Sequence, residues 1–237
     1  RSREGNSMKI DCLDKGYVRL VDHMGSDVSA VNAARVSFDK ESKEFTEKDE
    51  KLLKYLAAHG HTSPFRHAFV SLELYAPLMV CRQLWKYCVA SSHIESSQAW
   101  NEVSKRYTAE NTEFTVPRPG EWRSAPTDKK QGSGEPIDYD LGRKFTTMLE
   151  MSQVAGENLY NEAMKAGICA EQARLFLPAY GLYVRWRWAG SLAMFLHVLD
   201  QRLHHDAQKE TQEYAKAIAT IVKELYPSAY QAFVPGN

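Results

Sequence analysis

Two stretches of the chain alternate between apolar and polar side chains, the pattern of a strand with one face toward a core. The first covers residues 68–75, where alanine, valine and leucine occupy every second position. The second covers residues 182–188, where leucine, valine and tryptophan alternate with one tyrosine and two arginines. Residues 17–21 are rich in β-branched and aromatic side chains and predict an earlier strand. We expect the tryptophans to face inward and the arginines outward.

Helical spacing of apolar residues, together with capping signals, predicts seven helices. In chain order they cover residues 27–37, 46–60, 78–87, 138–166, 169–176, 191–200 and 206–226. Thr46 and Asp49 resemble a capping box, and we expect Asp206 to cap the last helix. Residues 117–136 hold four prolines and three glycines and predict a loop or flap. The predicted fold class is α/β of a mixed, α+β-like kind, in which long helices pack a small mixed sheet.

The chain has 237 residues, enough for one large domain or two small ones. The motifs on both sides of the flap suit one shared site, so we expect residues 8–237 to form a single domain. Residues 1–7 are polar and precede Met8, which we interpret as the true start, so we leave them out of the fold. Hydrophobic residues make up 43%, which favours a packed core over disorder. The apolar runs are shorter than the roughly 18–20 residues of a membrane span.

Charge and cysteine usage narrow the classes of protein that fit. Thirty basic and thirty acidic residues give a net charge of zero, which disfavours a dedicated nucleic-acid-binding protein. Cys12, Cys81, Cys88 and Cys169 form no C-x-x-C pair. This spacing fits neither a disulfide framework nor a zinc site and indicates a reducing compartment, for which we expect the cytoplasm.

Two short segments concentrate groups that bind anions. On a helix, Arg82 and Lys86 share a face, where an anionic ligand would relieve their repulsion. A solvated cationic face is the alternative interpretation. In residues 101–107, the donors of Ser104 and Arg106 are placed to wrap a phosphate, and Glu102 adds an acceptor for a sugar or ring. An ordinary surface turn explains the same residues equally well.

Other chemical groups give weaker predictions. Arg174 stands among apolar residues, and because burying an unpaired guanidinium is costly, we expect it to point into a site. His59-x-His61 and His204-His205-Asp206 each offer an incomplete set of metal ligands, so no metal site is predicted. Cys88 is interpreted as a small filler in preference to a nucleophile.

Several segments, taken in order, resemble the flavin-dependent thymidylate synthases. The family signature is Arg-His-Arg, then seven residues, then serine, usually followed by Arg-Tyr. Its second half is present as Ser-Lys-Arg-Tyr at residues 104–107. Similar stretches occur at residues 18–27, 33–38, 59–67, 188–192 and 202–208. The resemblance runs from about residue 16 to residue 234.

The resemblance implies both an assembly and a reaction. It implies a homotetramer in which several subunits complete each active site. It also implies conversion of dUMP to dTMP, with 5,10-methylenetetrahydrofolate as carbon donor, NADPH as reductant and FAD carrying the hydride. In such a reaction the cofactor carries out the redox chemistry, and the protein orients the reacting groups and stabilises their charges.

Carried over position by position, the resemblance implies two sets of site residues. Flavin contacts are implied at Ser63, Lys86, Tyr87, Cys88, Glu102, Ser191, Leu192, Ala193 and His197. Contacts to dUMP are implied at Gln83, Lys86, Glu102, Val103, Ser104, Lys105, Arg106, Arg174 and Arg202. Arg202 is also implied to be catalytic, because a guanidinium against the pyrimidine favours ionisation at N3 and so activates the ring.

Two features depart from the family pattern. Lys86-Tyr87-Cys88 stands in place of Arg-His-Arg, and lysine cannot copy the bidentate fork of arginine. Fifteen residues separate Cys88 from Ser104 where the family has seven, and the additional eight fall within residues 89–100. An alternative hypothesis is therefore a non-catalytic relative that binds the nucleotide and has lost flavin turnover. A module that binds RNA or DNA is a third hypothesis, which the zero net charge disfavours.

Overall fold

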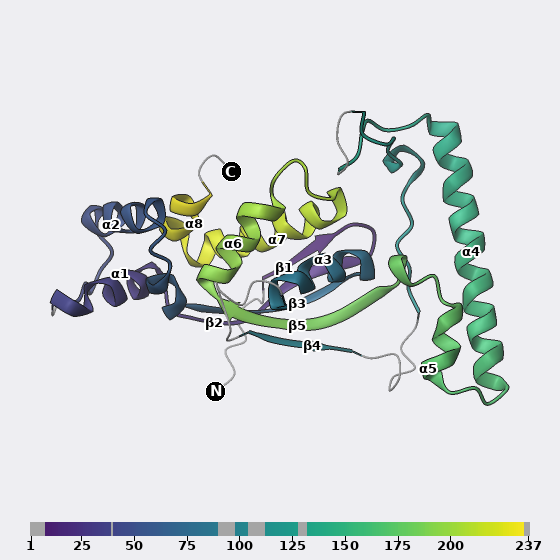
Figure 1. The fold of residues 1–237 in the computed structure, drawn as a ribbon, viewed down its shortest axis with the longest axis horizontal. Helices are drawn as coiled ribbons and strands as arrows, with labels where there is room; N and C mark the ends of the chain where they lie inside the picture. The colour runs from purple at the N-terminus through teal and green to yellow at the C-terminus, as the bar shows by residue number, and fades with distance from the viewer. Residues whose placement is uncertain (1–7, 39, 90–97, 104–111, 128–131, 235–237) are drawn as a thin grey trace.

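Five strands form one sheet across the middle of the molecule (Figure 1). The computed structural model describes residues 8–38, 40–87, 98–103, 112–127 and 132–234, and residues 88 and 89 by their backbone only. The strands are β1 (Lys9–Cys12), β2 (Gly16–Met24), β3 (Phe69–Pro77), β4 (Ala99–Glu102) and β5 (Tyr183–Ser191), in the spatial order β1-β2-β3-β5-β4. The three predicted strands are confirmed as β2, β3 and β5. β1 and β4 have four residues each, too few for a recognisable period.

The pairing of the strands is antiparallel throughout this sheet. The mixed helix-and-strand class is confirmed, whereas the strand directions differ from the mixed sheet that we expected. A period of two reports which face of a strand is buried and carries no information about the direction of its neighbours. At the centre of the sheet, Leu72 of β3 pairs with Leu20 of β2 on one side and Trp188 of β5 on the other.

Eight α-helices lie within the described residues: α1 (Asp27–Arg35), α2 (Glu47–Ala58), α3 (Leu78–Val89), α4 (Tyr139–Lys165), α5 (Ala170–Ala173), α6 (Leu192–Arg202), α7 (Lys209–Leu225) and α8 (Pro227–Phe233). Short 3₁₀ turns are η1 (Val36–Phe38), η2 (Ser63–His67), η3 (Pro119–Glu121), η4 (Arg174–Phe176) and η5 (Ala179–Gly181). None of these helices combines the length and apolar character needed to cross a membrane.

The seven predicted helices are present, with two corrections near the C-terminus. Asp206 lies in the turn after α6, and Gln208 occupies the N-cap position of α7 without a side-chain capping bond, so the cap expected at Asp206 is wrong. Pro227 begins a further short helix, α8, which was not among the predicted helices. Proline fits the first turn of a helix because its missing N–H has no partner there in any case. The capping box of Thr46 and Asp49 is confirmed.

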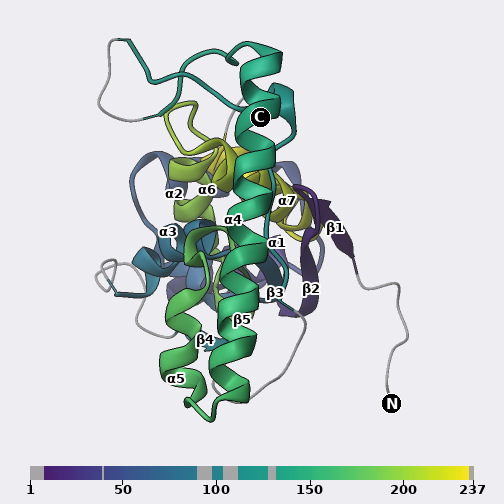
Figure 2. The same ribbon diagram turned by 90° about the vertical axis from the view of Figure 1, so that its right-hand side faces the viewer.

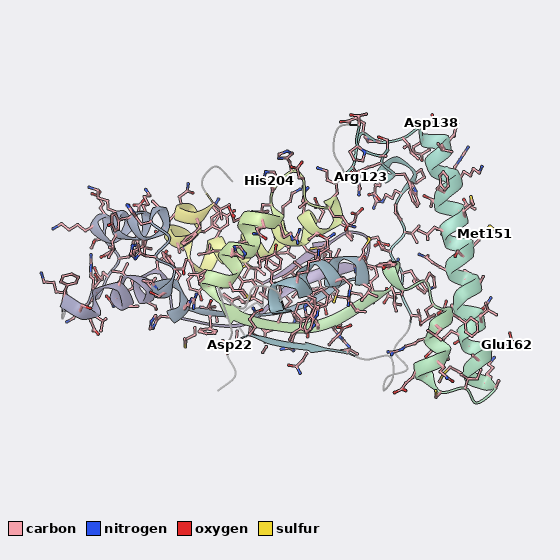
Figure 3. The ribbon with its side chains drawn as sticks, viewed as in Figure 1. Asp22, Arg123, Asp138, Met151, Glu162 and His204 are labelled. Atoms are coloured by element: carbon pink, nitrogen blue, oxygen red, sulfur yellow. The ribbon has the colours of Figure 1, made fainter. Side chains whose placement is uncertain are left out.

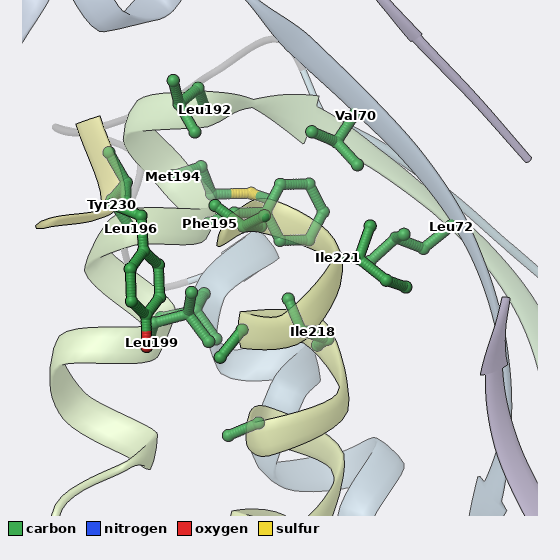
Figure 4. Packing of buried hydrophobic residues seen from close by; sticks show 14 of the residues in the cluster. Val70, Leu72, Leu192, Met194, Phe195, Leu196, Leu199, Ile218, Ile221 and Tyr230 are labelled. Atoms are coloured by element: carbon green, nitrogen blue, oxygen red, sulfur yellow. The ribbon is translucent and has the colours of Figure 1, made fainter. Parts of the chain in front are cut away.

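The core lies between one face of the sheet and helices α3, α6 and α7 (Figure 1). Trp186 and Trp188 of β5 are buried there, while Arg187 between them is exposed and pairs with Glu73 at 2.8 Å. The inward tryptophans and outward arginine of this strand are therefore confirmed. Figure 4 shows the apolar side chains of α6 and α7 packed toward β3. This packing holds the end of α6, where Arg202 lies, at a defined place above the sheet.

Helix α4 stands to one side of this core and packs with α5 and η4 (Figures 1 and 2). Its buried positions are small or polar, namely Gly142, Gln153, Gly156 and Ala163. A Cβ atom on Gly142 would lie 1.9 Å from the Pro119 carbonyl oxygen, so only glycine lets the flap cross the helix there. The larger apolar side chains of α4 face away from the chain's own core. They include Leu141, Phe145, Met148, Met151, Val154 and Leu159.

Asp49 stabilises the start of α2 from a buried position. Burial alone would raise the pKa of its carboxyl, but hydrogen bonds from Thr46, Ser42 and Arg35 hold that pKa below its ordinary value. Such a carboxyl stabilises the fold above its unfolded pKa of about 3.9, and the stabilisation is lost as the pH falls through the folded value. We expect Asp49→Asn to lower the free energy of unfolding at pH 7 by about 3 kcal/mol. Urea denaturation at pH 7 and at successively lower pH measures this difference, which should shrink in acid.

Glu50→Gln is the matched control on the same helix. Glu50 pairs with Lys54 at 2.6 Å, but both side chains are largely exposed. An exposed pair of this spacing contributes only about 0.3–0.5 kcal/mol. Equal costs for the two substitutions would contradict the role assigned to Asp49.

Candidate functional site

A pocket of about 410 Å³ opens between α3, the flap and the turn that joins α6 to α7. Among the predicted site residues, it brings together Gln83, Lys86 and Arg202. The other described residues that line it are Arg123, Gly132, Ser133, Asp206, Ala207, Gln208 and Lys209. In Figure 3, Arg123 on the flap and His204 on the turn mark the edge of the molecule where this pocket lies. Residues more than a hundred positions apart thus form one site.

Helix α3 presents its polar residues to the pocket because its other face is in the core. Leu84 is fully buried, whereas Gln83 is half-buried and Lys86 is exposed. The Gln83 side-chain amide donates to Oε1 of Gln208 at 2.5 Å and so links α3 to the start of α7. Lys86 follows Gln83 by three positions, so both side chains project from the same side of the helix.

Arg202 ends α6 and lies over the ring of Tyr87, with its guanidinium carbon 5.4 Å from the ring centroid. The Tyr87 hydroxyl donates to Oε1 of Gln201 at 2.9 Å, which fixes the ring. Burial raises the pKa of Tyr87, and the nearby charge of Arg202 opposes that rise. The Nε atom of Arg202 is buried and has no hydrogen-bond partner among the described residues. A buried donor of this kind is costly unless a ligand accepts from it.

The pocket has an excess of positive charge. Lys86, Arg123, Arg202 and Lys209 line it, and Asp206 is the acidic residue among its described lining. Arg123 is partly neutralised, because its guanidinium donates to Glu210 at 2.7 Å and to Ser133 at 2.8 Å. The remaining cations are suited to a phosphate or an ionised ring.

Arg123 was not predicted from the sequence as a site residue. Burial raises the pKa of Glu210, but its bond to Arg123 outweighs this and leaves the pKa below the ordinary value. Glu210 therefore carries its charge and holds the flap against α7. The flap has no periodic pattern that indicates which of its side chains turns inward, so no local signal was available.

Residue Tyr87 also connects the site to the inserted stretch, residues 89–100. The Gln98 side chain donates to the Tyr87 carbonyl oxygen at 2.8 Å and accepts from the Trp188 indole at 3.3 Å. The Trp100 ring packs on Trp186, with centroids 4.9 Å apart. The end of the insertion is thus anchored on β5, next to the helix that carries Lys86.

The implied flavin residues are spread over several elements. Ser63 is exposed at the start of η2. Ser191 is fully buried and caps α6 by accepting from the Met194 amide at 3.2 Å, and Leu192 and Ala193 are buried in the core. His197 is half-buried, with its ring 5.8 Å from that of Tyr87. Within one chain, His197 is thus linked to the pocket through Tyr87.

The nucleotide loop is described only at its beginning. Glu102 is exposed at the end of β4, and the Val103 amide donates to the Arg185 carbonyl oxygen at 2.9 Å. Ser104, Lys105 and Arg106 lie outside the described residues, as does the side chain of Cys88.

Arg174 is exposed on η4, and it is not among the described residues that line the pocket. Its Nε atom donates to the Glu171 carbonyl oxygen at 3.3 Å. Leu175 and Phe176 beside it are also exposed. Within one chain, Arg174 is thus a surface residue outside this pocket, and its implied contact with dUMP stays a prediction.

Comparison with known proteins assigns this chain to a family. The model of the family described as thymidylate synthase complementing protein matches residues 19–228. The flavin-dependent thymidylate synthase of Thermotoga neapolitana is 39% identical over 230 residues, which cover 96% of this chain and 94% of that protein. A flavin-dependent thymidylate synthase of Thermus thermophilus is 37% identical over 226 residues, covering 95% of this chain and 78% of that protein.

A solved structure agrees with these relatives. The UMP/dUMP methylase PolB from Streptomyces cacaoi, bound with 5-Br dUMP, superposes with a TM-score of 0.79 at 26% identity, covering 94% of this chain and 97% of that one. The chain belongs to the thymidylate synthase complementing protein family. The resemblance to flavin-dependent thymidylate synthases found in the sequence is thereby confirmed.

Proposed function

We propose that this protein is an enzyme that methylates dUMP to dTMP with a flavin cofactor, FAD. The observation that carries the proposal is the convergence of Gln83, Lys86 and Arg202 on one cationic pocket. The curated relatives are named for this reaction, and the structural neighbour was solved with a dUMP analogue. We propose methylenetetrahydrofolate as the carbon donor and NADPH as the reductant.

Each of these pocket residues is proposed to make a different interaction with dUMP. The Gln83 amide offers both a donor and an acceptor to the edge of a pyrimidine. Lys86, together with the loop of residues 104–106, supplies charge for the phosphate. Arg202, fixed over Tyr87, places a cation beside the ring and stabilises the negative charge that develops when N3 ionises. The orphaned Nε atom of Arg202 fits such an anion.

The residues that the resemblance implies for the flavin include exposed and half-buried side chains on several elements. Lys86, Glu102 and Ser63 are exposed, and His197 lies against the platform of Tyr87. These side chains, with Cys88 and residues 191–193, are those that we propose to hold FAD. When bound, FAD supplies the hydride chemistry that the protein's own side chains cannot perform.

We propose that the site is completed by other subunits of a homotetramer. Leu141, Phe145, Met148 and Leu159 recur at spacings of four, three and eleven residues along α4 and are exposed. Such spacing forms a seam of the kind that packs against another helix. Arg174 lies next to α4, so assembly through this seam would carry it toward the pocket of a neighbour.

The absorbance spectrum of the purified full chain, followed by tritium release from dUMP labelled at C5, tests the proposal. We expect a yellow protein that releases tritium only when folate and NADPH are both present. UMP labelled at the same position should be the comparison substrate, because the structural neighbour is described as acting on both nucleotides. Protein that stays colourless with FAD and dUMP would contradict the flavin. Binding of dUMP without NADPH oxidation would favour the non-catalytic relative instead.

A further inference from the structure

The turn between α6 and α7 carries two histidines and an aspartate whose side chains converge. His204, His205 and Asp206 each place one potential ligand atom within 4.8 Å of the others, and among the described residues they are the group of three that does so. Nε2 of His205 lies 3.1 Å from Oδ1 of Asp206, and Nδ1 of His204 lies 3.7 Å from Oδ2. The sequence suggested an incomplete ligand set, and the fold of the turn brings the three named side chains together.

The two separations from the histidine nitrogens to the Asp206 carboxylate, 3.1 and 3.7 Å, are close to those that one metal ion imposes. Bonds of about 2.0–2.2 Å from a central ion to nitrogen and oxygen place neighbouring ligand atoms about 3 Å apart. Two imidazoles and one carboxylate suit zinc, cobalt, nickel or copper, whereas magnesium and calcium prefer sites made of oxygen atoms. We propose that His204, His205 and Asp206 bind one divalent transition-metal ion of the zinc type, with water in the remaining positions.

The backbone of the turn is held in place without the ion. The buried Gln212 side chain donates to the carbonyl oxygens of His205 at 3.2 Å and Ala207 at 2.6 Å. The Ala207 amide donates to the His204 carbonyl oxygen at 3.0 Å. The three ligand side chains are 40–71% exposed, so an ion can reach them from solvent. A turn that is ordered beforehand lowers the entropic cost of binding.

Asp206 is the residue on which the site depends most. Arg202 and Lys209 line the same pocket as Asp206, and their charges oppose a cation. The carboxylate of Asp206 must offset them, so replacing it with an uncharged group of the same shape should weaken binding strongly. The metal site requires neither flavin nor nucleotide, so a test of metal binding does not depend on the proposed function.

Calorimetric titration of the untagged full chain with Zn²⁺ tests the site, with Co²⁺ as a spectroscopic probe. We expect one ion per chain, undisturbed by millimolar Mg²⁺, and visible Co²⁺ absorption from a site with nitrogen ligands. Asp206→Asn, His204→Ala and His205→Ala should each weaken Zn²⁺ binding at least about tenfold. Thermal unfolding of the metal-free variants should match that of the original chain, because the side chains are exposed.

The chain offers a matched control in its other histidine pair. His59 and His61 have ring centroids 6.4 Å apart and are exposed, and they belong to no group of three ligands among the described residues. His59→Ala with His61→Ala should leave Zn²⁺ binding unchanged. Absence of stoichiometric Zn²⁺ uptake would overturn the proposal. Unchanged Zn²⁺ affinity in Asp206→Asn would also overturn it, as would loss of Zn²⁺ binding in the His59→Ala, His61→Ala control.

Discussion

Arg202→Ala is expected to reduce dTMP formation by about 10²–10³-fold while the protein remains folded. The guanidinium lies over the Tyr87 ring, and its buried Nε atom has no hydrogen-bond acceptor among the described residues. Removing one preorganised donor from a developing negative charge typically costs that factor in rate. The stability cost is small, since a cation–π contact is worth roughly 0.5–2 kcal/mol. Tritium release measures the rate, and thermal unfolding measures the fold.

Two further variants separate the role of Arg202 from the general effect of removing a cation. Arg202→Lys keeps the charge but not the planar fork, and it should recover only part of the rate. Arg143→Ala removes an exposed arginine on α4 that pairs with Asp140, and it should leave turnover unchanged. Substantial turnover in Arg202→Ala would refute the activating role.

Met148→Glu combined with Leu159→Glu is expected to dissociate the tetramer that we propose and to abolish most turnover. Both side chains belong to the exposed apolar seam of α4, at 51% and 47% exposure. An assembly that covers this seam would have to bury two unpaired carboxylates, each at a cost of several kcal/mol. Turnover should fall with assembly, because the proposed site takes Arg174 from a neighbouring subunit. Light scattering coupled to size-exclusion chromatography measures the mass, and tritium release measures turnover.

Val154→Glu is the control for this double substitution. Val154 is also exposed on α4, at 58%, but its position along the helix places it about 120° around the helix axis from Met148. It should keep both the tetramer and the rate. A seam variant that stays tetrameric, or that loses its mass without losing turnover, would contradict the assembly that we propose.

Local patterns predicted those elements that are long enough to show a period. β3 and β5 have nine residues each, and their alternation was visible because one face of each strand lies on the core. β1 and β4 were missed because four residues cannot establish a period. The second role of Pro227, at the start of α8, was missed because proline occurs both after one helix and at the beginning of another.

The site residues were predicted by a different route. Gln83, Lys86 and Arg202 were placed together by family resemblance, whereas spacing alone left a solvated helix face open as the alternative. Arg123 was missed because its position depends on the ion pair with Glu210, which lies 87 residues away in the sequence. The sequence of the flap alone gives no indication of such an ion pair.

The sequence by itself determined the longer strands and helices, the inward tryptophans of β5 and the family, because these depend on side-chain order along the chain. Only the tertiary structure decided where the side chains of the loops and of α4 point. The glycines of α4 face its own chain and the larger apolar side chains face outward, which its amphipathic pattern could not reveal. The same holds for the turn of His204, His205 and Asp206, whose geometry follows from the bonds of Gln212. Periodicity records that a face is apolar, whereas the neighbour that covers it is set by contacts between distant parts of the chain or between chains.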